Sequence, residues 1–156
     1  MKNMLDVVSC ILFRKGKILL LRRSKKVSTY KGFWGVVAGY VEENEKPEET
    51  AYKEIKEEVG IRRNDIKLLK RMEPITVLDK YGGKEYNWRI HPFLFELKRD
   101  VDVKVDWEHI NYKWVEPENI VKFKTVPCLK EIIFRFFSLQ KRGGEGWGKC
   151  GGGEER

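Results

Sequence analysis

Short apolar runs separated by polar residues mark the first forty residues of the chain. LDVVSCILFR (5–14) and KILLLRR (17–23) are rich in apolar residues, and only two residues lie between them. Two such runs with a two-residue connection predict a β-hairpin. After a polar segment, FWGVVAGYV (33–41) is apolar again and predicts a further strand.

A second group of apolar runs follows in the C-terminal half. IKLLKRMEPITVL (66–78) predicts a strand that is interrupted near Pro74, since proline cannot donate to a sheet. EYNWRIHPFLFELK (85–98) predicts a long strand and NYKWV (111–115) a short one. In VPCLKEIIFRFFSL (126–139), the apolar residues recur at helical spacing, which predicts a final helix.

Between the two groups the apolar spacing also becomes helical. Ala51, Ile55 and Val59 fall on one stripe. Pro47 suits the first turn of a helix, and Gly60 suits the position just after its end. We therefore expect a helix from residue 47 to residue 59, with its apolar stripe against a sheet, in an α/β fold.

The length of 156 residues is that of one domain. We expect this domain to span residues 1–140 and the last sixteen residues, 141–156, to form a flexible tail because seven of them are glycine. No apolar run reaches the roughly 18 residues of a membrane-spanning helix, and the first residues do not have the pattern of a signal peptide. We therefore expect a cytoplasmic protein without a membrane partner.

Charge is unevenly distributed along the chain. The formal net charge is +8 and the pI is about 9.3, yet residues 41–60 contain eight glutamates and only three lysines. An acidic segment in a basic protein suits an anionic ligand that is held through a divalent metal ion. A basic total also suits nucleic acid, but the basic residues are scattered and no aromatic RNA-binding motif is present. Nucleic acid is therefore not expected as a partner.

Two glutamates of the acidic helix lie beside its apolar stripe. On a helical wheel, Glu58 lies about 20° and Glu54 about 60° from Ala51. Carboxylates at the border of a buried face are costly unless a cation or a proton compensates them. Clustered carboxylate oxygens favour Mg²⁺ or Mn²⁺. The alternative is a solvated helix with lysine–glutamate pairs at i, i+4, which leaves the position of these glutamates unexplained.

The acidic helix belongs to the longer segment GYVEENEKPEETAYKEIKEEVGI (39–61), which we call the box. The box closely resembles the signature of the Nudix hydrolases, G-x5-E-x7-R-E-U-x-E-E-x-G-U, in which U is apolar. The one departure among nine specified positions is Lys53, where the family has arginine. The likeness extends over about residues 5–138. The matching residues are Gly39, Glu45, Glu54, Ile55, Glu57, Glu58, Gly60 and Ile61.

The resemblance implies an α/β/α sandwich with a mixed, partly antiparallel sheet, in which the box forms a loop, a helix and a loop. It also implies Mg²⁺ as the cofactor, with Mn²⁺ as a possible substitute. By position, Glu57 and Glu58 resemble the family's principal metal ligands, and Glu54 resembles a third ligand or the base that deprotonates water. The backbone carbonyl of Ala38 corresponds to a further ligand.

The remaining box residues resemble residues that position the ligands, namely Gly39, Glu45, Lys53 and Gly60. Lysine retains the charge of the family's arginine but loses its bidentate geometry, which leaves the effect of Lys53 on catalysis open. Some members of the family take the general base from a loop outside the box. Glu108 is our candidate for that role, with an ordinary exposed carboxylate as the alternative.

Basic residues outside the box are candidates for contact with the substrate. Arg22, Arg23 and Lys31 flank the loop before the box and either contact phosphates or form a plain basic surface. Arg89 and His91 are two residues apart, so they share one face of the strand at 85–98. They are candidates for contact with phosphate or ribose.

The resemblance thus implies a pyrophosphohydrolase that cleaves a nucleoside diphosphate linked to another group. Sugars of the ADP-ribose type, nucleoside triphosphates and dinucleoside polyphosphates all remain open as substrates. A module that binds nucleotides without turnover and an RNA-decapping enzyme are the alternatives. The four box glutamates favour an enzyme over the first alternative. Whether the protein is a monomer or a homodimer stays open.

Overall fold

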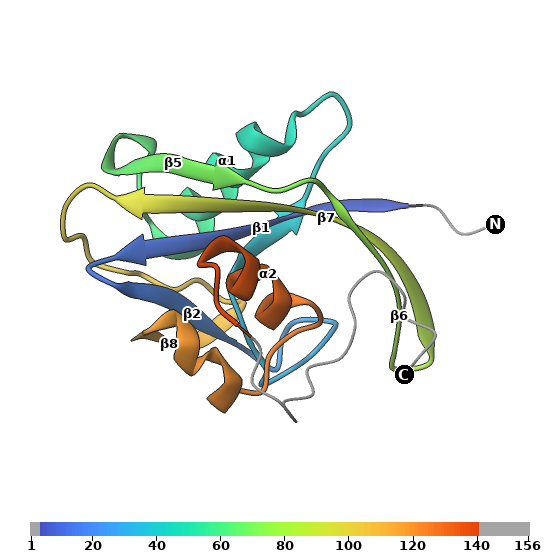
Figure 1. The fold of residues 1–156 in the computed structure, drawn as a ribbon. Coiled ribbons are helices and arrows are strands. Elements are labelled where there is room, and N and C mark those ends of the chain that lie inside the picture. Colours follow the sequence, from blue (N-terminus) through green and yellow to red (C-terminus); the bar gives the residue numbers. More distant parts are fainter. Residues whose placement is uncertain (1–3, 141–156) are drawn as a thin grey trace.

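The computed structural model describes residues 4–140, which form an eight-stranded mixed sheet with a helix against each of its two faces (Figure 1). This arrangement confirms the predicted α/β fold. No helix within 4–140 is long and apolar enough to cross a membrane. The predicted tail at 141–156 lies outside the described residues.

The elements are β1 (Leu5–Arg14), β2 (Lys17–Arg23), β3 (Trp34–Gly35), β4 (Val37–Tyr40), α1 (Pro47–Val59), η1 (Arg63–Asp65), β5 (Ile66–Arg71), β6 (Ile75–Tyr81), β7 (Lys84–Leu97), β8 (His109–Val115), η2 (Pro117–Lys122) and α2 (Leu129–Phe136).

The sheet divides on one side of β1. The hairpin of β1 and β2 is paired only near its turn, at Phe13↔Ile18 and Arg14↔Lys17. Beyond that point β4 pairs with β1, starting at Cys10↔Val37, while β2 pairs with β3 and β8. The other edge of β1 pairs in parallel with β7. The sheet therefore opens between β2 and β4.

This division explains one difference from the predicted elements. The apolar run at 33–41 is two strands, because β3 pairs with β2 and β4 pairs with β1. The chain crosses from one part of the sheet to the other at Val36, between the two strands. The last helix is also shorter than predicted, since Cys128 adopts φ 71° and α2 begins only at Leu129.

Each face of the sheet has its own hydrophobic core. On the α1 face, Ala51 and Ile55 pack with Val8 and Phe95, and all four side chains are fully buried. On the opposite face, α2 contributes Ile132 and its neighbours. Burial of one such side chain stabilises a fold by about 1.5–3 kcal/mol, so the two cores hold α1 and α2 firmly on the sheet.

The hairpin of β6 and β7 extends away from the rest of the sheet (Figure 1). Its strands pair from Ile75↔Ile90 to Tyr81↔Lys84, and Gly82 and Gly83 form the turn with positive φ. We call residues 75–90 the arm.

Candidate active site

The helix α1 has the limits that the sequence predicts. Pro47 occupies its first turn, and the last helical residue is Val59. Gly60 then adopts φ 72°, and its N–H donates to the carbonyl of Lys56 at 3.0 Å. A left-handed backbone favours glycine, so Gly60 is where the helix stops and the chain turns toward β5.

Two glutamates of α1 lie against the backbone of β4. A Cβ atom added to Gly39 would come within 2.8 Å of Glu54 Oε1 and closer still to the Cδ atom of Glu54. The N–H of Ala38 donates to Glu58 Oε1 at 3.4 Å. Residues from the start and the end of the box therefore meet, and only glycine leaves space for Glu54 at position 39.

Glu58 is a buried carboxylate without full compensation. The residue is 1% exposed, and its Oε2 atom has no hydrogen-bond partner among residues 4–140. Burial raises the pKa of Glu58 well above its usual range, and the nearby charges of Glu108 and Glu54 raise it further. A buried acceptor that makes no hydrogen bond costs free energy. A cation beside this oxygen would remove that cost.

Four glutamates, Glu54, Glu57, Glu58 and Glu108, act on one another at this site, and Asp106 acts on two of them. Burial raises the pKa of Glu54, and the charge of Glu57 adds to the effect, while a hydrogen bond with Glu58 opposes it. Burial is also the main cause that raises the pKa of Glu108, and the charges of Asp106 and Glu54 raise it further. Glu57, which directly precedes Glu58 on α1, is exposed. The structure thus brings the predicted loop carboxylate, Glu108, together with the glutamates of the box.

The loop that carries Glu108 is fixed to the last turn of α1. The N–H of Lys104 donates to the carbonyl of Val59 at 3.0 Å, and the N–H of Asp106 donates to the carbonyl of Glu58 at 3.1 Å. The carbonyls at the end of a helix need such partners. The N–H of Glu108 then donates to Asp106 Oδ1 at 3.2 Å, so the position of Glu108 depends on α1.

His109 and Asp106 are site residues that the sequence did not reveal. His109 is 6% exposed, its Nδ1 lies 3.0 Å from Asp106 Oδ1, and its Nε2 lies 3.9 Å from Glu58 Oε1. Burial lowers the pKa of His109, although Asp106 opposes the shift. The i, i+3 spacing of the aspartate and the histidine was the only available signal, and such a pair is common.

Glu45 and Lys53 form an ion pair. Lys53 Nζ lies 2.8 Å from Glu45 Oε2, and the Thr50 hydroxyl donates to Glu45 Oε1 at 2.5 Å. The hydrogen bond from Lys53 is the largest of the effects that lower the pKa of Glu45 to about 2, and the same bond raises the pKa of Lys53. The pair connects the loop of the box to the middle of α1, beside Glu54.

Among the predicted basic residues, Arg23 is within electrostatic reach of the carboxylates. Its Nε donates to the carbonyl of Thr29 at 3.0 Å. Burial lowers the pKa of Arg23, while the charges of two carboxylates of the site, Glu108 and Glu58, raise it. Arg22 is exposed and donates to the carbonyl of Gly32, and Lys31 is exposed on the same loop.

Arg89 and His91 contact a different carboxylate. Arg89 donates to both oxygens of Asp6, at 2.6 Å and 3.0 Å. The Nε2 atom of His91 lies 2.8 Å from Asp6 Oδ1. The parallel pairing of β1 with β7 brings the three residues together. Any phosphate at Arg89 or His91 must compete with Asp6.

The donor set suits a hard divalent cation. Glu54, Glu57 and Glu58 would supply carboxylate oxygens, and Ala38, whose N–H donates to Glu58, would supply its backbone carbonyl. Mg²⁺ prefers such oxygens and keeps several waters. In the part of the chain that the structure describes, no three acidic, histidine or cysteine side chains already surround a common point as metal ligands do. Binding of an ion there would require the carboxylates to move closer together.

Comparison with known proteins identifies the family of the chain. The family model described as the NUDIX domain matches residues 4–136. Nucleoside triphosphatase NudI of Escherichia coli O81 (strain ED1a) is 29% identical over 124 residues, which cover 75% of this chain and 85% of that protein. The crystal structure of the MutT protein from Methanosarcina mazei Go1 is 27% identical with a TM-score of 0.70, and covers 90% of this chain and 98% of its own. A C. elegans Ap4A hydrolase shares the fold, with a TM-score of 0.71 and 23% sequence identity. The match covers 86% of this chain and 96% of that chain.

Proposed function

The chain belongs to the Nudix family of hydrolases, and we propose that it is a metal-dependent pyrophosphohydrolase whose substrates are nucleoside triphosphates. The observation that carries the proposal is the buried Glu58, whose Oε2 has no hydrogen-bond partner within residues 4–140, in a group of four carboxylates. The choice of nucleoside triphosphates, among the three classes that the sequence left open, is supported by the activity named for the NudI relative.

We propose Glu54, Glu57, Glu58 and the carbonyl of Ala38 as the residues that hold Mg²⁺ or Mn²⁺. When bound, such an ion lowers the pKa of a water molecule, orients phosphate oxygens and offsets the charge that develops at phosphorus. These three glutamates are among the eight of the acidic segment at 41–60, which gives part of that segment a role in a chain of net charge +8.

Two carboxylates fit the role of general base for the attacking water. Burial raises the pKa of both Glu54 and Glu108, and a base is most effective when its pKa approaches the working pH. Glu54 is held against Gly39, whereas Glu108 lies on a loop that is fixed to α1. Arg23 is within electrostatic reach of Glu108 and Glu58 and would bind the phosphates there.

We propose that Glu45 and Lys53 position the catalytic residues without contacting the reacting atoms. Lys53 precedes Glu54 on α1, and its ammonium group is bound by Glu45. A lysine makes a point contact where arginine would make two parallel hydrogen bonds. One contact to Glu45 is enough to connect the loop to the helix, so we expect the departure at Lys53 to be compatible with turnover.

A panel of nucleotides tests the proposed function. The full chain is incubated in Mg²⁺ or Mn²⁺ with nucleoside triphosphates, ADP-ribose, dinucleoside polyphosphates and capped RNA, and products formed in ¹⁸O-water are identified by mass spectrometry. We expect metal-dependent release from nucleoside triphosphates, with ¹⁸O on a phosphate product because water attacks phosphorus. Absence of turnover with every compound in both metals would refute the proposal.

A further inference from the structure

The imidazole of His109 is buried between two carboxylates. Its Nδ1 atom lies 3.0 Å from Asp106 Oδ1, and its Nε2 atom lies 3.9 Å from Glu58 Oε1. The side chains of His109 and Glu58 are each 2% exposed. The two ring nitrogens therefore face different partners in a region that is closed to bulk water.

Asp106 determines which ring nitrogen keeps its lone pair. A carboxylate only accepts hydrogen bonds, so Nδ1 carries the proton that Asp106 accepts, and in a neutral imidazole the lone pair is then on Nε2. This nitrogen is the one on the side of Glu58. Histidines that bind metal ions typically donate their other N–H to a carboxylate, which fixes the tautomer and the orientation of the ring. His109 and Asp106 have this arrangement.

The backbone fixes the ring relative to Glu58. The N–H of Asp106 donates to the carbonyl of Glu58 at 3.1 Å, and the N–H of His109 donates to the carbonyl of Asp106 at 3.1 Å. His109 is also the first residue of β8, where it pairs with Arg23 on β2. The approach of Nε2 to Glu58 therefore depends on the fold of the loop and the strand.

The separation of the two side chains suits an ion that both contact. Ligand atoms about 2.1 Å from an octahedral ion lie about 3.0 Å apart when they are adjacent and about 4.2 Å apart when they are opposite. The distance of 3.9 Å between His109 Nε2 and Glu58 Oε1 falls between these values. The second oxygen of Glu58, Oε2, has no hydrogen-bond partner among residues 4–140. A shared ion would therefore require only a small movement of the two side chains.

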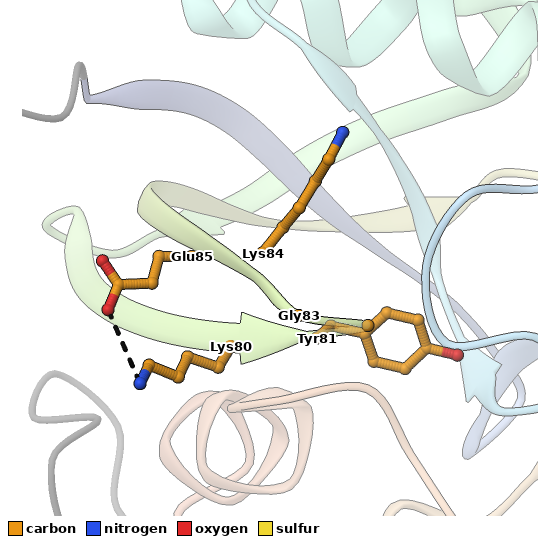
Figure 2. Close-up of a pocket in the computed structure, with 6 residues that line it drawn as sticks. Lys80, Tyr81, Gly83, Lys84 and Glu85 are labelled. Atoms are coloured by element: carbon orange, nitrogen blue, oxygen red, sulfur yellow. Dashed lines mark ion pairs between the residues drawn. The ribbon is translucent and has the colours of Figure 1, made fainter.

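The pocket at the turn of the arm offers no comparable donors. Glu85 supplies the carboxylate among the residues that line it, and Glu85 Oε2 lies 3.7 Å from Lys80 Nζ across the hairpin. Figure 2 shows this ion pair on one side of the hairpin and Tyr81 pointing away from it. A cation at the turn would have to displace a lysine, whereas Nε2 of His109 meets a carboxylate.

We propose that His109 is a nitrogen ligand of the metal ion at Glu58 and that Asp106 holds it in the ligating tautomer. The inference rests on the proposed function, since it adds a ligand to the ion of that site. Mg²⁺ prefers oxygen ligands, whereas imidazole is a common ligand of transition metals. We therefore expect His109 to favour Mn²⁺ over Mg²⁺.

The nitrogen ligand can be identified because the chain contains only two histidines, His91 and His109. One equivalent of Mn²⁺ is added to the full chain without an affinity tag, and nitrogen coupling to Mn²⁺ is measured by pulsed electron paramagnetic resonance with ¹⁴N- and ¹⁵N-histidine. We expect an isotope-sensitive coupling in the wild type and in His91→Gln, and none in His109→Gln. Because His91→Gln retains His109, the assignment does not depend on the folding of His109→Gln.

Absence of nitrogen coupling in the wild type would overturn the proposal, as would failure to bind Mn²⁺. Loss of the coupling in His91→Gln, with an unfolding temperature that shows a retained fold, would overturn it too. If the coupling is present but no nucleotide is hydrolysed, the proposed function fails and the ligand assignment stands. Turnover without nitrogen coupling would give the opposite result.

Metal affinities distinguish a ligand from a residue that only supports Glu58. Dissociation constants for Mn²⁺ and Mg²⁺ are measured by calorimetry for the wild type and His109→Gln. We expect the variant to bind Mn²⁺ at least about 10-fold more weakly and Mg²⁺ within about threefold of the wild type. Equal weakening of both metals would show that His109 acts only through the position of Glu58, and would overturn the proposal.

Discussion

The carboxylate of Glu54 occupies the space in which Gly39 would carry a side chain. An added Cβ at Gly39 would lie 2.8 Å from Glu54 Oε1, which is closer than ordinary contact. The relationship joins the first residue of the box to the helix that follows it. The close contact with Glu54 explains why this position requires glycine. A left-handed backbone is not the reason, because the φ of Gly39 is not positive.

Replacement of Gly39 by alanine should displace Glu54. We expect kcat to fall by about 100-fold, because small misplacements of catalytic groups have effects of that size. Gly35→Ala is the matched control, since its new Cβ would meet only Val126 at 3.6 Å. The rates of both variants with the best substrate are compared, and equal rates for the two would show that the contact with Glu54 is unimportant.

The ion pair of Lys53 with Glu45 should support catalysis indirectly. We expect Lys53→Met to lower kcat/KM by about 10- to 100-fold, as is usual when a partner that orients metal ligands is lost. Lys53→Arg should remain within about threefold of the wild type, because arginine also donates to Glu45. Lys56→Met, at an exposed lysine of the same helix, controls for the loss of charge. Wild-type activity in Lys53→Met would contradict the positioning role.

The buried Glu58 predicts a stabilising effect of metal ions. At a Mg²⁺ concentration about 100 times Kd, binding adds about 2.7 kcal/mol, which corresponds to an increase in Tm of about 5–10 °C for a protein of this size. The raised pKa of Glu58 means that its charged form is costly in the metal-free fold. Glu58→Gln should therefore have the higher Tm in EDTA and a much smaller response to Mg²⁺. An identical response in both proteins would count against this ligand.

The contact of Asp6 with Arg89 and His91 predicts how the stability of the fold changes at low pH. The hydrogen bond from Arg89 is the main cause that lowers the pKa of Asp6 from 3.8 to about 2. A carboxylate with a lower pKa in the folded state stabilises the fold above its unfolded pKa, and the effect is lost as the pH falls through the folded value. The free energy of unfolding should therefore fall from about pH 4 to pH 2.

Urea unfolding over this pH range checks the dependence on Asp6. Asp6→Asn should be less stable than the wild type at pH 6, and the difference should shrink toward pH 2. Asp102→Asn, at an exposed position, should follow the wild type throughout. A constant difference between Asp6→Asn and the wild type would show that Asp6 does not titrate with a lowered pKa.

Local patterns in the sequence predict much of this molecule. Pro47, the apolar stripe and Gly60 determine α1, and all three signals lie within or beside the helix itself. Long-range pairing escapes such reasoning. Arg89 and His91 share a face as predicted, but both side chains form hydrogen bonds with Asp6, which lies more than 80 residues earlier in the chain.

Long-range hydrogen bonds also determine the position of the loop at 100–108. Glu108 was a candidate from its position alone, whereas its place beside the box results from backbone hydrogen bonds to the end of α1. His109 is buried near Glu58, and neither spacing nor composition reveals that position. The sequence therefore predicts the helix of the box and its family well, and the long-range partners of the box poorly.

The metal dependence of hydrolysis tests the central claim most directly. Initial rates with the best nucleoside triphosphate are measured in EDTA and over a Mg²⁺ titration for the wild type, Glu57→Gln and Glu43→Gln, an exposed control in the loop of the box. We expect no activity in EDTA, recovery with Mg²⁺ in the wild type and the control, and a loss of about 100-fold or more in Glu57→Gln. Turnover that persists in EDTA, or a Glu57→Gln variant as active as Glu43→Gln, would contradict the assignment of the box as a metal-dependent catalytic site.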